Sequence, residues 1–270
     1  MLLMALLMML LLLLSIRCVG GFFSNRLPLR MTTTVSALET ESTKVLLRRE
    51  MASPVPSKLR IYGLIDRLCE EKREEGESGA FLGTWILLWT DDDKTRASPF
   101  FWAFRKAFGE TEVPAGNLAD SVFKITDAIP SSLKQIGSVR QYVQASGKLV
   151  SQIEIVSPIG SSFMTTTSRW SEIGGRDGEG GLGGGGEVEL RVEKTQVLGS
   201  TLQRMLNIPS SSPLVAQGFP SGAALELASP GSSTVGLTNL YIDDMLRVSK
   251  NDFDKVFVFE RAVGVLQPVG

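Results

Sequence analysis

The side chains with the clearest potential for chemistry form a compact block near the C-terminus. Asp243, Asp244 and Arg247 lie within Tyr241–Glu260, where two apolar, β-prone runs flank the polar loop Asn-Asp-Phe-Asp. Two neighbouring carboxylates could work as a general acid and a general base. Neighbouring residues of a strand point to opposite faces of a sheet, however, so a strand through both acids would separate them. We favour the alternative that one acid holds Arg247 or caps the hairpin.

A run of three acids, Asp91–Asp93, follows the apolar segment Phe81–Thr90. Adjacent carboxylates invite a metal-binding interpretation. A calcium loop, however, needs ligands that alternate along a longer turn and end in a distal Glu. Consecutive side chains diverge, so we expect a solvated turn here and no metal site.

Two glycine-containing patterns also resemble functional motifs. The G-x-G-x-x-G of Gly178–Gly183 lies in a glycine-rich stretch, 174–186, that is followed by a predicted strand. A dinucleotide site needs a helix after this pattern, so we interpret 174–186 as a flexible loop that joins two strands. Gly160–Met164 approaches the G-x-S-x-G of a nucleophile elbow, but Met164 replaces its second glycine. Neither pattern predicts an active site.

The composition excludes several kinds of chemistry. The chain has no histidine, which removes Ser-His and Cys-His catalysis, His-ligated metals and imidazole proton shuttles. Cys18 lies in a predicted signal, and Cys69 lies on the apolar side of a predicted helix, where we expect packing. With 28 Lys and Arg against 29 Asp and Glu, no basic excess is available for nucleic acid. We expect no cofactor, no metal and no catalysis; a lipid-directed enzyme using Asp, Glu, Tyr or Lys stays an alternative.

The N-terminal segment has the composition of a targeting address. Leu2–Leu14 is apolar throughout, and about 13 residues are too few to span a bilayer but suit a secretory signal. Residues 22–50 begin with Phe22 and contain Arg, Ser and Thr but no acid before Glu39. We predict a signal peptide over 1–21, then a plastid transit peptide and linker over 22–50. Simple secretion is the alternative.

Two helices are predicted downstream of a linker over Thr40–Ser57. Lys58–Glu75 has apolar residues at helical spacing. Ser98 and Pro99 suit the N-cap and first position of a short aromatic helix that extends to Phe108. Its aromatic side chains could fill the core over one end of a barrel. They could also form a lid or face a lipid interface, which aromatic and basic residues together suit.

Strands dominate the rest of the chain. In Leu149–Val156, apolar Leu149 and Ile153 alternate with Gln152 and Glu154, which is typical of a sheet with one solvated face. The predicted strands number about eight: Trp85–Trp89, Ser121–Ile129, Val139–Gln144, Leu149–Val156, Phe163–Trp170, Val188–Glu193 and the two arms of Tyr241–Glu260. Eight antiparallel strands can close a small barrel that holds one ligand, so the predicted fold class is mainly β.

Three segments resemble the plastid lipid-associated protein, or fibrillin (plastoglobulin), family. They are Gly83–Thr90, reading GTWILLWT, Thr165–Trp170, reading TTTSRW, and Tyr241–Ser249, reading YIDDMLRVS. The last is similar to the family's C-terminal motif. Met245 stands where that family usually has an acid, and the glycine loop is an insertion.

The resemblance implies a fold and a biological setting. It implies a lipocalin-like barrel domain over 57–265, residence in a plastid, and association with plastoglobules or thylakoids. It implies binding of apolar isoprenoids or lipids of the carotenoid, quinone or tocopherol class at a membrane or lipid-body surface, without catalysis. An adaptor for an isoprenoid-biosynthesis enzyme, such as one of prenyl-quinone synthesis, is the alternative.

The resemblance also implies roles for individual residues. Trp85 and Arg247 are expected to meet at the closed end of the barrel, in an Arg–aromatic contact worth roughly 1–2 kcal/mol, and to be structural rather than ligand-binding. The full set of expected structural motif residues is Gly83, Trp85, Arg169, Tyr241, Asp243 and Arg247. For lipid or membrane contact we select Phe101, Trp102 and Phe104 of the aromatic helix.

Overall fold

The computed structural model describes residues 43–75, 81–109, 135–157, 160–173, 186–198 and 217–263. The predicted signal peptide and the predicted strand Ser121–Ile129 lie outside these ranges, as does most of the predicted glycine loop.

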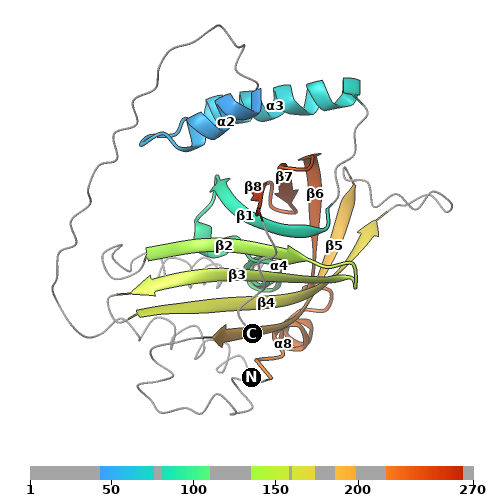
Figure 1. Cartoon of the computed structure of the whole chain (residues 1–270). Helices are drawn as coiled ribbons and strands as arrows, with labels where there is room; N and C mark the ends of the chain where they lie inside the picture. Colours follow the sequence, from blue (N-terminus) through green and yellow to red (C-terminus); the bar gives the residue numbers. More distant parts are fainter. Residues whose placement is uncertain are drawn as a thin grey trace, which may run out of the picture.

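The described strands close into one antiparallel barrel (Figure 1). Each strand pairs with the next along the chain, and the last pairs with the first, so the sheet has no free edge. The strands are β1 Gly83–Thr90, β2 Gln135–Val143, β3 Lys148–Ser157, β4 Gly160–Ile173, β5 Glu187–Leu198, β6 Thr234–Ile242, β7 Leu246–Asn251 and β8 Val256–Arg261. The predicted antiparallel barrel of about eight strands is therefore confirmed.

Side-chain alternation explains why these segments form the wall of a barrel. In β5, Val188, Leu190 and Val192 are buried, whereas Glu189 and Arg191 between them are exposed. This period of two places the apolar residues inside. In β3 the expectation of a solvated outer face is wrong at Gln152, which is buried and donates to the Thr165 hydroxyl at 3.2 Å.

The C-terminal region differs from the prediction in its strand boundaries. Tyr241–Lys250 was expected as one strand, but β6 ends at Ile242 and β7 begins at Leu246. The chain turns between them, because the Asp243 carboxylate accepts hydrogen bonds from the amides of Met245 at 2.7 Å and Leu246 at 2.6 Å. Local side-chain-to-backbone bonds of this kind compete with a continuing strand. β6 was therefore missed as a strand of its own.

Two helices cover the outside of β6, β7 and β8 (Figure 1). α3 Lys58–Glu75 matches its predicted bounds and buries Ile61, Ile65 and Leu68 in a second apolar cluster outside the barrel. α2 Thr43–Met51 corrects the linker predicted over Thr40–Ser57, because these residues form a helix.

Contacts with the barrel explain why α2 is helical. Leu47 is fully buried, and Lys44 and Arg48 form ion pairs with Asp243 at 2.5 Å and Glu260 at 2.8 Å. A helix of nine residues is marginal alone, so this packing stabilises it.

Two further helices lie at the end of the barrel where β1 finishes. α4 Pro99–Phe108 packs against α8 Ser221–Ala228, β5 and β6. Ser98 is the N-cap residue of α4, as predicted, but its hydroxyl makes no capping bond. It donates instead to Thr166 of the barrel wall at 2.9 Å. α8 was not predicted, because it is short and lacks a polar cap.

Candidate functional site

A line of polar side chains crosses the mainly apolar interior of the barrel. Gln141 of β2 pairs in register with Ser151 of β3, Ser151 with Thr166 of β4, and Thr166 with Thr195 of β5. All four side chains are buried. Arg247 lies next to Gln141 and continues this line. We call these five residues the interior polar row.

One end of the interior polar row is joined to the helices by hydrogen bonds; we call it the helix end. Ser98, before α4, donates to Thr166 at 2.9 Å, and Thr166 lies 3.5 Å from the Thr195 hydroxyl. Thr195 in turn bonds to Ser221, the first residue of α8, at 2.9 Å. Each of these four buried hydroxyls has a partner, as buried polar groups in proteins usually do.

The other end of the row, which we call the Arg247 end, is built around a fully buried arginine. Arg247 of β7 reaches across the interior and donates from Nη2 to the Gln141 side-chain oxygen. Its guanidinium carbon lies 4.2 Å from the ring centre of Phe259, 5.0 Å from that of Trp85 and 5.1 Å from that of Phe81. These rings supply cation–π stabilisation to a charge that is removed from water.

A second arginine adds positive charge to this end. The Arg261 guanidinium carbon lies 4.3 Å from the ring centre of Trp85, so the same indole contacts both arginines. Burial, and to a smaller extent the charge of Arg261, together lower the pKa of Arg247 to about 9. Arg247 therefore still carries its charge at neutral pH.

Several polar atoms at the Arg247 end have no hydrogen-bond partner within the described part of the chain. They are Nε and Nη1 of Arg247, the amide nitrogen of Gln141 and the hydroxyl of Ser151. None of the acids in the described ranges forms an ion pair with Arg247. A buried donor left unbonded typically costs about 1–3 kcal/mol, so a group of them is unusual.

The structure places the expected motif residues in different surroundings. The expected contact between Trp85 and Arg247 is present, and both side chains are fully buried. Gly83 has φ 128°, a backbone conformation that residues with a side chain rarely adopt, which favours glycine there. Arg169 lies outside this group: it is exposed and pairs with Glu193 across β4 and β5 at 3.2 Å.

The two acids of the C-terminal block, Asp243 and Asp244, have different surroundings. Asp243 caps the β6–β7 turn and also accepts from the Tyr241 hydroxyl at 2.7 Å, while Asp244 is exposed. The turn that Asp243 caps is therefore a different one from the predicted hairpin loop at 251–254, and the acid does not hold Arg247, whose side chain points into the barrel. Burial alone would raise the pKa of Asp243, yet bonds from Lys44, Tyr241 and two amides outweigh it and lower the pKa to about 2.

The residues selected for lipid contact lie in the aromatic helix α4. Trp102 and Phe104 are each only 4% exposed, and Trp102 packs against Phe257 of β8 with ring centres 5.0 Å apart. The Trp102 indole donates to the Arg96 carbonyl at 2.8 Å. These two residues fill the barrel core and offer little surface to a membrane, whereas Phe101 is half-buried.

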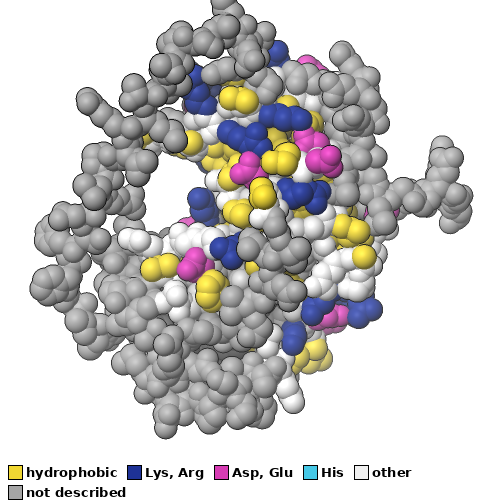
Figure 2. Space-filling model, viewed as in Figure 1, with side chains coloured by type: hydrophobic (Ala, Val, Ile, Leu, Met, Phe, Trp, Pro, Cys, Tyr) yellow, Lys and Arg dark blue, Asp and Glu magenta, His cyan; other side chains and the backbone are white. Residues whose placement is uncertain are grey.

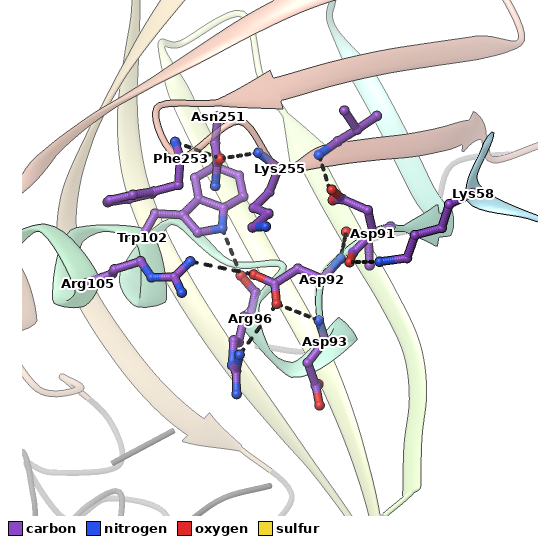
Figure 3. Close-up of polar contacts among 12 residues, drawn as sticks. Lys58, Asp91, Asp92, Asp93, Arg96, Trp102, Arg105, Asn251, Phe253 and Lys255 are labelled. Atoms are coloured by element: carbon purple, nitrogen blue, oxygen red, sulfur yellow. Dashed lines mark hydrogen bonds and ion pairs between the residues drawn. The ribbon is translucent and has the colours of Figure 1, made fainter. Parts of the chain in front are cut away.

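The three consecutive acids form a structural corner between β1 and α4 (Figure 3). Asp91 accepts from the Tyr62 hydroxyl at 2.7 Å and from the amide of Val256 at 2.9 Å. Asp92 lies between Arg96 and Arg105, at 3.5 and 3.9 Å. Asp93 caps the 3₁₀ turn Lys94–Arg96. The carboxylates therefore connect α3, α4 and the β7–β8 hairpin to the end of β1. They make more protein contacts than the predicted solvated turn would make.

Sequence reasoning missed Gln141 and Ser151 as site residues. Each stands next to another polar residue of its strand, so the sequence alone does not show which of the two faces inward. The sequence contained one weak signal for their orientation. Gln141 lies two residues from the apolar Val143, and Ser151 lies two residues from the apolar Leu149, so each polar residue shares a strand face with an apolar one.

The face in Figure 2 and the described helices show the following features. On the face in Figure 2, Lys and Arg side chains lie among Asp and Glu side chains, as the balanced composition implies. In the described ranges, no group of three or more His, Cys, Asp and Glu could hold a metal ion. No described helix is long and apolar enough to cross a membrane.

The fold defines the class of protein as a closed, antiparallel, eight-stranded barrel with a mainly apolar interior. Comparisons with family models, curated proteins and solved structures found no match.

Proposed function

We propose that this protein is a non-enzymatic lipid-binding protein of a plastid, where it binds or coats apolar isoprenoid or lipid molecules at plastoglobules or thylakoids. The observation that carries the proposal is the closed barrel with a mainly apolar inner wall. Eight-stranded barrels of this kind can hold one small ligand. The plastid setting and the isoprenoid class rest on the motif resemblance and on the composition of the N-terminal segment.

The ligand class can be tested by extraction and titration. The full chain would be purified from its native membranes, and its bound lipids would be extracted and analysed by mass spectrometry. The lipid-free protein would then be titrated with a carotenoid, a prenylquinone and a tocopherol, using quenching of tryptophan fluorescence as the readout. We expect a saturable one-to-one complex that disappears when the chain is unfolded in urea.

Two outcomes would contradict the proposal. A chain that carries no isoprenoid or acyl lipid, and binds none on titration, does not bind lipid as its function. Recovery of one stoichiometric enzyme partner with a lipid-free barrel would support the adaptor alternative instead. A fluorescent fusion that is secreted, rather than retained in plastid lipid bodies, would contradict the proposed location.

A further inference from the structure

The loop between α2 and α3 holds apolar side chains in water. Val55 in this loop and Leu59 in the first turn of α3 are each 84% exposed. The smaller apolar residues around Val55 are exposed as well; they are Ala52, Pro54 and Pro56. Single exposed apolar residues are common on protein surfaces, whereas a group of them marks an interaction site. We call Ala52–Leu59 the α2–α3 tip, which lies at one end of the helix pair (Figure 1).

Local bonds hold the α2–α3 tip in place. The Ser57 amide donates to the Glu50 carboxylate at 2.9 Å, and Lys58 Nζ donates to the Asp91 carbonyl at the end of β1 at 2.9 Å. The two prolines of the tip have fixed φ angles. Beneath the tip, the helices bury Leu47 and Ile61 against the barrel. An exposed group that is already ordered loses little conformational entropy when it binds a partner.

The charges beside the tip are mainly positive. Basic residues of 48–60 outnumber acidic ones; they are Arg48, Arg49, Lys58 and Arg60, against Glu50. Glu260 pairs with Arg48 at 2.8 Å, so four basic residues face two acids. The Arg60 side chain is 76% exposed and lies 3.8 Å from Glu50. The neighbouring corner Asp91–Asp93 adds no net charge, because it is matched by Lys94, Arg96 and Arg105.

This combination selects one kind of partner. Apolar side chains flanked by basic ones match a lipid surface, where negative head groups lie above an apolar layer. A stable contact with a protein buries roughly 20–30 residues on each side, which the tip of eight residues does not offer. The tip therefore suits an anionic lipid surface better than a second copy of the chain or another protein.

We propose that the α2–α3 tip docks this protein on lipid surfaces that contain anionic lipids. Val55 and Leu59 enter the head-group layer, and Lys58 and Arg60 contact its negative charges. The inference rests on the proposed function and names the surface through which the protein meets a membrane or lipid body. It places this contact on the helix pair outside the barrel, in contrast to the buried Trp102 and Phe104 of α4.

The first experiment measures binding to vesicles and locates the contact. The full chain is mixed with vesicles of phosphatidylcholine, or of phosphatidylcholine with phosphatidylglycerol, and the bound fraction is measured by flotation. We expect about tenfold or more tighter binding to the anionic vesicles, weakening as salt is added. Hydrogen exchange followed by mass spectrometry should show slower exchange over 52–59 with vesicles present, and no change in β4. Attachment through another segment would not slow exchange at the tip.

The second experiment removes the apolar side chains of the tip. Val55→Ser combined with Leu59→Ser should weaken binding to the anionic vesicles about tenfold or more. Leu227→Ser is the matched control, because Leu227 of α8 is 76% exposed and lies outside the tip. Circular dichroism checks the fold of each variant.

The third experiment removes one charge. Arg60→Gln should weaken binding to the anionic vesicles about fivefold and leave binding to phosphatidylcholine unchanged. Arg169→Gln is its matched control, because Arg169 is 74% exposed and pairs with Glu193 on the barrel wall, as Arg60 pairs with Glu50 beside the tip.

The outcomes separate this inference from the proposed function. Unchanged exchange over 52–59, equal binding to both kinds of vesicle, or equal losses in the tip and control variants overturns the inference. Extraction and titration with isoprenoids still decide the ligand in that case. A dimer that depends on Val55 and Leu59, without binding to vesicles, assigns the tip to a second copy and also overturns it. Vesicle binding that depends on the tip, in a chain that binds no isoprenoid, supports the inference and contradicts the proposed ligand.

Discussion

The helix end and the Arg247 end of the interior polar row are equally buried but differently bonded. At the helix end, Ser98, Thr166, Thr195 and Ser221 bond to one another in a chain that joins two strands to two helices. At the Arg247 end, a charged side chain has one protein acceptor, Gln141, and nearby polar atoms have none in the described ranges.

This difference separates the two groups by what they contribute to stability. A fully bonded buried network stabilises one arrangement of a core, whereas a partly bonded one lowers stability. The helix end is therefore expected to stabilise this protein more than the Arg247 end does.

The largest expected effect comes from removing the indole that lies between the two arginines. Trp85→Ala should lower the free energy of unfolding by about 3–5 kcal/mol, because it leaves a large cavity in the core. It should cost more than Trp102→Ala, a matched loss at the opposite end, because Arg247 and Arg261 would also lose the ring that both contact. Urea unfolding measures both variants, and equal losses would show that Trp85 does not shield the charges.

The helix end should be the more sensitive to loss of a hydroxyl. Thr195→Val keeps the shape of the side chain but leaves Ser221 and Thr166 with fewer buried partners. We expect a loss of about 1–3 kcal/mol in the free energy of unfolding. A change below about 0.5 kcal/mol would mean that this network contributes little to the fold.

The turn before β7 links the Arg247 end to α2 through Asp243, and this link should depend on pH. The pKa of Asp243 is about 2 in the folded protein against 3.8 ordinarily, so its contribution is complete above pH 3.8 and is lost as the pH falls toward 2. Asp243→Asn should cost about 1–2 kcal/mol at pH 7.

Unfolding followed at several pH values tests the sign of this effect. The stability difference between the parent chain and Asp243→Asn should shrink between pH 4 and pH 2. Asp244→Asn, at the exposed neighbour, is the control and should be nearly neutral throughout. A constant difference across this range would show that the carboxylate is not the stabilising group.

The smallest expected effect is at the Arg247 end itself. Ser151→Ala removes a buried hydroxyl that has no described partner, so the lipid-free protein should change by less than about 0.5 kcal/mol or gain slightly. Thermal unfolding of Ser151→Ala and Thr195→Val compares the stability that a buried hydroxyl contributes at the Arg247 end and at the helix end. A loss above about 1 kcal/mol would show that Ser151 is bonded in solution and that the two ends are alike.

Much of the fold was predictable because it depends on local patterns. The bounds of α3 and the positions of β1 to β5 followed from apolar spacing along the chain. α2 and the break between β6 and β7 did not follow, because α2 is held by its contacts with the barrel and the break is made by Asp243. That carboxylate caps a turn and pairs with Lys44, and neither interaction can be seen from the spacing of residues.

The sequence alone determined the alternation that makes a closed barrel, the absence of histidine chemistry, and the contact between Trp85 and Arg247 that the motif resemblance implied. Only the tertiary structure decided which polar residues face inward together. Gln141, Ser151 and Arg247 come from three strands, and pairing across the sheet sets the register that aligns the first two. Closure of the barrel then brings Arg247 against Gln141, because residues distant in sequence become neighbours only when the first and last strands pair.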